Sequence, residues 1–304
     1  MTPRVSVGLP VYNGERFLEF AIGSLLGQTC GDFELIISDN ASTDGTEAIC
    51  RRYASLDSRV RYYRSERNRG AAWNHNRVVE LARAPYFKWA AHDDICAPSF
   101  LERCADVLDR EPSAILCYAQ TVLIDEAGQP LGLGANRCVP GSPDPFLRFR
   151  TLMETLALSD PMYGIIRADV LRQTALLGSY PAADLVLLSE LALRGTFQIV
   201  PETLFFRRDH AQKADRAHPA SAGLASWYDP NNQGKLVLRY WRLLVEYVGS
   251  ITRTPMGLSA RARCYVYMLR WFWWNLRDLR HELHIAAATV LRKACGAHPV
   301  STAR

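Results

Sequence analysis

Strand-like and helix-like segments alternate along the first 120 residues of this chain, and this alternation constrains its fold more than any other feature. Apolar runs typical of strands are separated by segments in which apolar residues return every three or four positions. We expect strands near 5–9, 33–38, 59–64, 86–91 and 114–119, and helices near 17–26, 44–54 and 70–82, with a further helix opened by Pro98. This order predicts an α/β fold with a mostly parallel sheet and helices on both faces.

Polar loops follow four of the expected strands. They span 10–15, 39–46, 66–76 and 92–94, and they are rich in Asn, Asp, Gly and Ser. In open α/β sheets, ligands bind beyond the carboxyl ends of the strands. We therefore expect these loops to meet around one binding site.

The rest of the chain has weaker signals. We expect a loop over 127–150, helices at 169–177 and 185–194, and strands at 197–201 and 203–207, in that order. An irregular segment over 214–232 then leads to a helical tail that begins near Gly234. These patterns predict a body over 1–215 and a linker with a helical extension over 216–304.

Composition and charge exclude several classes of protein. Apolar residues make up 48% and charged residues 22% of the 304 residues, which is typical of a folded domain rather than a disordered or collagen-like chain. The charge of +5 is uneven, because 12 basic and 3 acidic residues lie between Asn231 and Arg304. The eight cysteines form no zinc-binding pattern, so we expect them to be reduced. With no signal-like or membrane-spanning apolar run, we expect a cytoplasmic protein.

Several motifs are missing. The chain has no G-x-G-x-x-G, no G-x-x-x-x-G-K-[ST] and no G-x-S-x-G, so nicotinamide binding, P-loop chemistry and a nucleophile elbow are not expected. It also lacks a nucleic-acid recognition motif, so we expect no nucleic-acid partner.

Three aspartates and one histidine could have catalytic or metal-binding roles. Asp93 and Asp94 follow a strand, where two carboxylates suit Mg²⁺ or Mn²⁺ with a diphosphate, although Asp is also common in turns. Asp184 could act as a general base at a pocket mouth or simply cap the helix that follows. His210 could bind a metal or phosphate, or lie on the surface.

Asp39 opens a polar loop that enters a helix. Its carboxylate could accept hydrogen bonds from a pyrimidine N3–H or from ribose hydroxyls. The later part of this loop, 44–46, is typical of helix capping.

These motifs occur in a recognisable order: Leu9-Pro-Val-Tyr-Asn13 with Glu15, Ser38-Asp-Asn-Ala-Ser-Thr-Asp-Gly-Thr46, Asn68-Arg-Gly70 with Asn76, and His92-Asp-Asp94. Together they resemble glycosyltransferase family 2, whose members are inverting enzymes with the GT-A fold. The resemblance covers about residues 4 to 210 and leaves the tail uncovered.

The resemblance implies a nucleotide-diphosphate-sugar donor, with UDP-sugars favoured. It implies a nucleotide-sugar half over about 1–125 and an acceptor half over about 126–215. Asp184 would be the catalytic base, and Asp94 with His210 would bind Mn²⁺ or Mg²⁺. The donor nucleotide would be bound by Pro10, Val11, Tyr12, Glu15, Asp39, Asn68, Gly70, Asn76 and Asp93.

Three positions depart from the family pattern. Ala91 replaces the first acidic residue of the metal motif, His75 stands where Arg is usual, and Ala183 replaces the Glu before the base. A catalytically inactive nucleotide-sugar-binding or scaffold protein is therefore one alternative. A sugar-1-phosphate nucleotidyltransferase is another, but the chain lacks the Gly-rich, basic phosphate loop that it would need.

The tail combines aromatic and basic residues. Six aromatics lie between Tyr265 and Trp274, and Arg263, Arg270 and Arg277 recur every seven positions. This pattern suits an interfacial helix over 262–293 on anionic lipid at the inner face of the membrane, which would fit a lipid-linked acceptor as well as a saccharide. The alternative is a helix that packs on the catalytic domain or in a homodimer.

Overall fold

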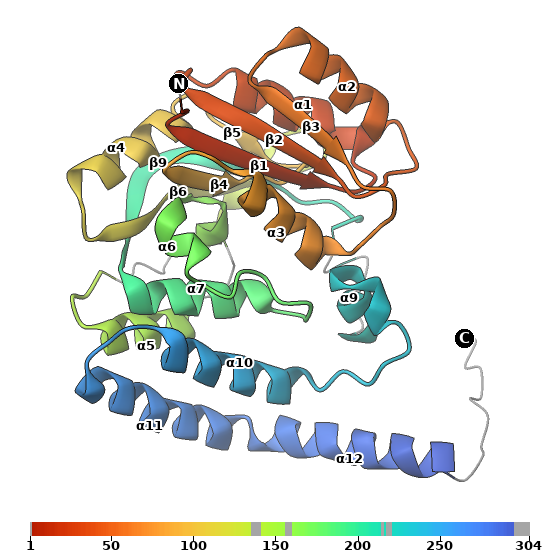
Figure 1. Ribbon diagram of the computed structural model, residues 1–304, viewed down its shortest axis with the longest axis vertical. Helices are drawn as coiled ribbons and strands as arrows, with labels where there is room; N and C mark the ends of the chain where they lie inside the picture. The colour runs from red at the N-terminus through yellow and green to blue at the C-terminus, as the bar shows by residue number, and fades with distance from the viewer. Residues whose placement is uncertain (1, 135–140, 156–159, 214–215, 217–220, 295–304) are drawn as a thin grey trace.

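The computed structural model describes residues 2–134, 141–155, 160–213, 216 and 221–294 (Figure 1). Within them, nine strands form one sheet: β1 (Val5–Val11), β2 (Phe33–Asp39), β3 (Val60–Arg64), β4 (Tyr86–Trp89), β5 (Ile95–Cys96), β6 (Ala114–Ile124), β7 (Pro130–Leu133), β8 (Ile165–Arg167) and β9 (Thr196–Arg208). The strand order is β3-β2-β1-β4-β8-β6-β9-β5, and β7 pairs with β6.

Two groups of parallel strands make up most of this sheet. β3, β2, β1 and β4 are parallel neighbours, and so are β6 and β9. The short strand β8 lies between the two groups and is antiparallel to both β4 and β6. The expected α/β fold with a mostly parallel sheet is confirmed.

Helices cover both faces of the sheet. The α-helices are α1 (Glu15–Leu26), α2 (Thr46–Leu56), α3 (Ala71–Leu81), α4 (Phe100–Arg110), α5 (Pro145–Thr155), α6 (Ala168–Arg172), α7 (Ala183–Arg194), α9 (Ser221–Tyr228), α10 (Arg239–Arg253), α11 (Leu258–Trp274) and α12 (Leu276–Ala294). Two 3-10 turns, η1 (Asp160–Tyr163) and η2 (Pro230–Asn232), complete the described elements. Helices α1, α2 and α4 lie on one face, and α3, α6 and α7 lie on the other (Figure 1).

The strand sequences explain these two layers. Side chains alternate between the faces of a strand, so Leu35 and Ile37 of β2 join the core under α1 and α2, whereas Ile36 joins the core on the side of α3. All residues of β1 and β2 are buried because helices cover both faces.

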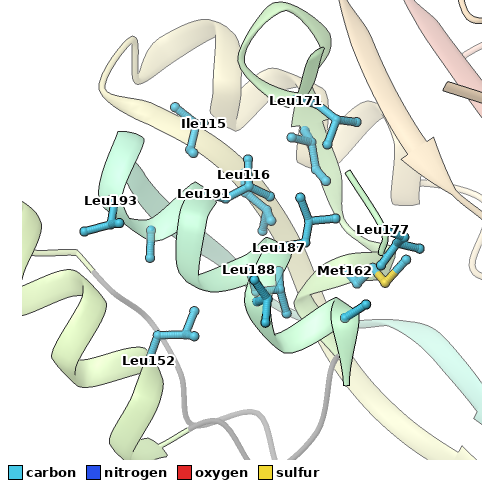
Figure 2. Close-up of a cluster of buried hydrophobic side chains, with 14 of the residues drawn as sticks. Ile115, Leu116, Leu152, Met162, Leu171, Leu177, Leu187, Leu188, Leu191 and Leu193 are labelled. Atoms are coloured by element: carbon cyan, nitrogen blue, oxygen red, sulfur yellow. The ribbon is translucent and has the colours of Figure 1, made fainter. Parts of the chain in front are cut away.

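The first helices of the tail pack on the body. Figure 2 shows leucines of α7 meeting Ile115 and Leu116 of β6 and Leu152 of α5. Tyr247 of α10 and Tyr267 of α11 belong to the same apolar cluster, and each ring contacts Phe149 of α5 edge-on. The packing expected as one alternative for the tail is therefore present on the inner side of α10 and α11.

Four local expectations about the second half are wrong. The loop expected over 127–150, of which 135–140 lie outside the described residues, contains β7 and the start of α5. The helix expected over 169–177 ends at Arg172, and the two strands expected between 197 and 207 form the single strand β9. The described part of the segment 214–232, expected to be irregular, contains α9 and η2.

Tertiary contacts explain the helix α5. Its buried residue Arg148 donates to the carbonyl oxygens of Ala192 (2.6 Å) and Leu193 (3.0 Å) at the end of α7, and Phe149 and Leu152 enter the core. Carbonyl groups at a helix end lack partners within their own helix. An arginine that binds them from another element leaves no local pattern in the sequence.

Six cysteines lie in the described part of the chain, and all six are free, as expected; Cys138 and Cys295 lie outside it. Among the described residues, no helix is both long enough and apolar enough to cross a membrane.

A buried carboxylate joins three elements near the amino ends of the strands. Glu34 on β2 accepts hydrogen bonds from Ser6 Oγ on β1 (2.7 Å), from Arg61 on β3 (2.6 Å) and from Arg83 (2.8 Å). Burial alone would raise the pKa of Glu34, but the hydrogen bonds from these donors outweigh burial and lower it.

We predict that Glu34→Gln lowers the free energy of unfolding by about 1–3 kcal/mol near neutral pH, because the charged acceptor of two arginines is lost. Because folding lowers the pKa of Glu34, its charge stabilises the fold fully above the unfolded pKa of about 4.3. The difference from wild type should therefore shrink as the pH falls below that value and through the lower pKa of the folded state. Urea titrations at several pH values would measure it. Glu80→Gln, at an exposed ion pair with Arg77, is the control and should cost less than about 1 kcal/mol; equal losses in both variants would contradict the prediction.

Candidate active site

A cleft of about 870 Å³ lies beyond the carboxyl ends of β1, β2 and β4. Its walls come from all four polar loops singled out in the sequence or from the helices that they open, from the start of α7, and from α9. The lining includes Pro10, Val11, Tyr12, Asn40, Asn68, Asp93, Asp94, Asp184 and His210. The polar loops therefore do meet around one cavity.

Reciprocal hydrogen bonds tie the loop after β1 to the loop after β2. The backbone N–H groups of Asn13 and Gly14 donate to the hydroxyls of Ser42 and Thr46, both at 2.9 Å. In return, the Asn13 side-chain oxygen accepts from the Thr43 N–H (2.8 Å). The loop after β2 thus fixes the loop after β1. Within its segment 44–46, expected to cap α2, the Asp44 carboxylate accepts from the Thr46 N–H (3.1 Å).

Three residues beside the cleft adopt a left-handed backbone conformation that is unusual for residues other than glycine. Asn13, Ala41 and Ala182 have φ of 52°, 63° and 68°. Such conformations persist only where the surrounding contacts hold them, and they cluster at binding sites. Ala182 directly precedes α7, so its conformation helps to direct the start of α7, which carries Asp184, toward the cleft.

The buried pair Asp93 and Asp94 is held by the end of β9. Asp94 Oδ1 accepts from the backbone N–H of Arg208 (2.9 Å), and Asp93 Oδ2 lies 2.8 Å from His210 Nε2. The Arg208 guanidinium donates to the Asp93 carbonyl oxygen (3.0 Å) and to the carbonyl oxygens of Asp125 and Glu126. Arg208 thus holds the Asp94 carboxylate and the Asp93 backbone, and His210 holds the Asp93 carboxylate.

The two carboxylates have opposite electrostatic environments. Burial raises the pKa of Asp94, and the neighbouring charge of Asp93 raises it further. Burial acts in the same direction on Asp93, but His92 and His210 outweigh it and lower the pKa of Asp93. Asp94 is therefore the carboxylate whose charge is least compensated, and it lines the cleft.

Asp184 is the second residue of α7 and lies in the wall of the same cleft. Tyr163 and Tyr228 line the cleft with it, and burial followed by nearby carboxylate charges, including that of Asp184, raises their pKa. Both phenols therefore stay protonated near neutral pH. The catalytic role expected of Asp184 stays a prediction.

Four predicted donor residues are not among the residues that line the cleft. Asp39 is fully buried, and its oxygens accept from the Ser42 N–H and the Tyr62 hydroxyl, both at 2.8 Å. Glu15 accepts from the Gly45 N–H (2.5 Å). The nucleotide-binding roles of these two residues stay predictions.

Gly70 and Asn76 are the other two. Gly70, at φ 88°, opens α3, and a Cβ there would lie 2.3 Å from the carbonyl oxygen of Tyr228. Only glycine allows this close approach of α9 to α3. Asn76 binds both the N–H (3.0 Å) and the carbonyl oxygen (2.9 Å) of Leu177. Gly70 and Asn76 thus have structural contacts, and these contacts do not test their predicted roles in nucleotide binding.

Several lining residues carry no recognisable signal in the sequence. Arg207, at the end of β9, pairs with Asp160 (2.9 Å) and faces the cleft together with Lys213. Trp227 of α9 forms part of the opposite wall, next to Tyr228. A basic residue three positions before the candidate ligand His210 was the available clue for Arg207; none existed for Trp227.

Within the described residues, no group of three or more His, Cys, Asp or Glu side chains is arranged to hold a metal ion. Asp94 and His210 both line the cleft, but His210 Nε2 is bound to Asp93, and His210 Nδ1 is buried without a hydrogen-bond partner.

Comparisons with known proteins agree with this geometry. The profile of Glycosyl transferase family 2 matches residues 6–173. The chain is 32% identical over 134 residues to a chondroitin synthase of Escherichia coli, a match that covers 44% of this chain and 19% of that protein. It is 33% identical over 129 residues to a putative teichuronic acid biosynthesis glycosyltransferase of Bacillus subtilis, which covers 42% of this chain and 51% of the relative. The matches thus span about half or less of these relatives.

Solved structures share the fold at low sequence identity. TarS 1–349 of S. aureus, in complex with UDP-GlcNAc, superposes with a TM-score of 0.63 at 16% identity, over 93% of this chain and 80% of that chain. A mannosyltransferase from Pyrobaculum calidifontis, in complex with GDP-Man and Mn²⁺, gives a TM-score of 0.53 at 17% identity, over 98% and 80%. The fold is the GT-A fold. Because the family profile covers more than half of its length, the chain belongs to glycosyl transferase family 2.

Proposed function

We propose that this protein is an inverting glycosyltransferase that moves a sugar from a nucleotide-diphosphate sugar to an acceptor hydroxyl. The observation that carries the proposal is that Asp94 and Asp184, far apart in the sequence, line one cleft at the carboxyl ends of parallel strands. One carboxylate is suited to the diphosphate end of a donor and the other to an acceptor hydroxyl.

The donor would enter over the loop after β1. Pro10, Val11 and the half-exposed Tyr12 line this part of the cleft, next to Asn68. Lys213 and Arg207 add positive charge near Asp94, where a diphosphate would lie. We favour a UDP-sugar, because TarS binds UDP-GlcNAc, although the related mannosyltransferase binds GDP-Man.

The residues around Asp94 fit a divalent cation. Asp94 is a buried carboxylate with a raised pKa and a second carboxylate beside it. A dication would stabilise its charged form. Asp94 would hold Mn²⁺ or Mg²⁺, and His210 would supply a second ligand. When bound, the cation would neutralise the charge that develops on the leaving diphosphate. The Mn²⁺ bound by the related mannosyltransferase supports this assignment.

Asp184 would act as the catalytic base. It would take the proton from the acceptor hydroxyl as the oxygen attacks the anomeric carbon, on the face opposite the diphosphate, so that the configuration inverts. Trp227 and Tyr228 of α9 line the cleft that Asp184 also lines and offer flat apolar surfaces to a sugar ring. The acceptor would be a saccharide or a lipid-linked saccharide in cell-surface polysaccharide, glycolipid or glycoconjugate synthesis, as the names of the two curated relatives suggest.

The expected cytoplasmic location, the possible homodimer and the absence of a nucleic-acid partner stay predictions. The alternative of an inactive nucleotide-sugar-binding protein rests on Ala91, His75 and Ala183, and turnover assays decide it.

We predict that Asp184→Asn lowers sugar transfer by about 10²–10⁴-fold, because an amide cannot accept the proton. The affinity for UDP, measured by calorimetry, should stay within about twofold of wild type, because the change lies outside the donor loops. Asp169→Asn is a matched control, since Asp169 is also the second residue of a helix but is exposed on α6. If Asp184→Asn turned over normally, Asp184 would not be the base. If the wild type itself failed to turn over any donor, the alternative of an inactive nucleotide-sugar-binding protein would be favoured.

We predict that Mn²⁺ tightens UDP binding to the wild type and has little effect on Asp94→Asn. The amide oxygen can still accept from the Arg208 N–H, so the fold is retained while the ligand charge is lost. Calorimetric titrations of UDP with Mn²⁺ and with EDTA would measure the difference, with Asp209→Asn, which pairs with Arg216 nearby, as the control. An equal Mn²⁺ effect in wild type and Asp94→Asn would refute Asp94 as a metal ligand.

A further inference from the structure

The outer face of α11 and α12 carries an exposed stripe of apolar and basic side chains. Val266, Leu269, Trp273, Arg277 and Arg280 are spaced three or four residues apart, so they lie on one side of the two helices. We call these five residues the outer stripe. Helices α11 and α12 follow one another almost in line along the edge of the molecule (Figure 1).

The apolar members of the outer stripe are unusually exposed. Val266 is 58% exposed, Leu269 62% and Trp273 68%, and Trp274 beside them is 60% exposed. Large apolar side chains gathered on one exposed face commonly mark an interaction surface. Two of them are tryptophans, which are costly to expose to water.

This face is not needed to attach the helices to the body. Tyr267 and Met268 of α11 and Leu279 of α12 point inward and are buried, and Trp271 lies against Tyr247 of α10. The inner side thus accounts for the packing of α11, and the outer stripe has no covering element among the described residues.

Positive charge surrounds the apolar part of the outer stripe. Arg270 lies over the Trp274 ring, and Arg277 and Arg280 line a shallow hollow of about 550 Å³ on α12 together with His281 and His284. Of the two acidic residues on α12, Glu282 is occupied by the backbone N–H groups of Tyr240 (3.0 Å) and Trp241 (3.4 Å) at the start of α10. Asp278 is the other acid, so the hollow keeps an excess of positive charge.

These charges favour a lipid surface over a second copy of the chain. In a two-fold contact between copies, the arginines of one copy would face the arginines or apolar side chains of the other. Asp278 is the acid on α12 that could pair with them. Burying such charges without partners is unfavourable. A bilayer with anionic headgroups accepts both components, because tryptophan and leucine enter the boundary of the acyl chains while arginines meet phosphates.

We propose that the outer stripe, together with its neighbours Arg270 and Trp274, docks the protein on the surface of an anionic membrane. Leu269, Trp273 and Trp274 would insert at the interface, and Arg270, Arg277 and Arg280 would lie on the lipid phosphates. This surface lies outside the catalytic cleft, so the inference holds or fails independently of the proposed sugar transfer.

Flotation of the full chain with vesicles tests the proposal. Wild type should float with phosphatidylcholine–phosphatidylglycerol vesicles, and much less with phosphatidylcholine alone, and raised salt should weaken binding. Trp273→Glu should reduce binding by at least about tenfold. Arg277→Gln with Arg280→Gln should reduce it by about fivefold for each arginine, on anionic vesicles only.

Leu56→Glu is the matched control, because Leu56 is a 74% exposed apolar residue on α2, away from the outer stripe. It should float like wild type. Both glutamate variants should keep the wild-type thermal midpoint and UDP affinity, which separates loss of docking from loss of folding or of donor binding. The proposal is overturned if wild type does not float, or if Trp273→Glu and Leu56→Glu float alike. It is also overturned if no form floats and light scattering shows a wild-type dimer that the Trp273→Glu change dissociates.

Discussion

The side chain and backbone of Arg208 hold together the part of the structure on which the candidate site depends. Its N–H binds Asp94, and its guanidinium binds the Asp93 carbonyl oxygen and the turn after β6. Two carboxylates on adjacent residues repel one another, and burial makes the repulsion stronger. The end of β9, with His210 on Asp93, offsets this repulsion and keeps Asp94 facing the cleft. The second half of the chain thus organises a motif that belongs to the first half.

The same arrangement divides the cleft into two chemical regions. Loops after β1 and β4 provide the wall where the proposed function places a nucleotide diphosphate, and the start of α7, with α9, provides the wall that carries Asp184. Gly70 joins the regions, because the lack of a Cβ lets the end of α9 touch the start of α3. Under the proposed inverting transfer, a sugar held between these walls would have its leaving group on one side and its acceptor on the other.

The tail has two faces with different roles. The inner face of α10 and α11 extends the core around α7, so these helices are part of the folded body rather than an appendage. The outer face leaves tryptophans and arginines in solvent. The sequence pattern of the tail suggested either packing or membrane contact. Packing accounts for the inner side of these helices, and the outer side remains exposed.

The sequence predicts the order of the longer strands and helices in the first half and the positions of the polar loops, because apolar periodicity and strand-end residues are local signals. It also singled out Asp94 and Asp184, which the cleft brings together. It could not predict α5, whose Arg148 binds carbonyl oxygens of α7, or the burial of Asp39 behind the lining, because both depend on partners distant in the chain. The tertiary structure was needed to show that Arg208 holds the Asp93–Asp94 segment and which face of α11 stays exposed. Contacts between remote segments leave no regular spacing in the sequence.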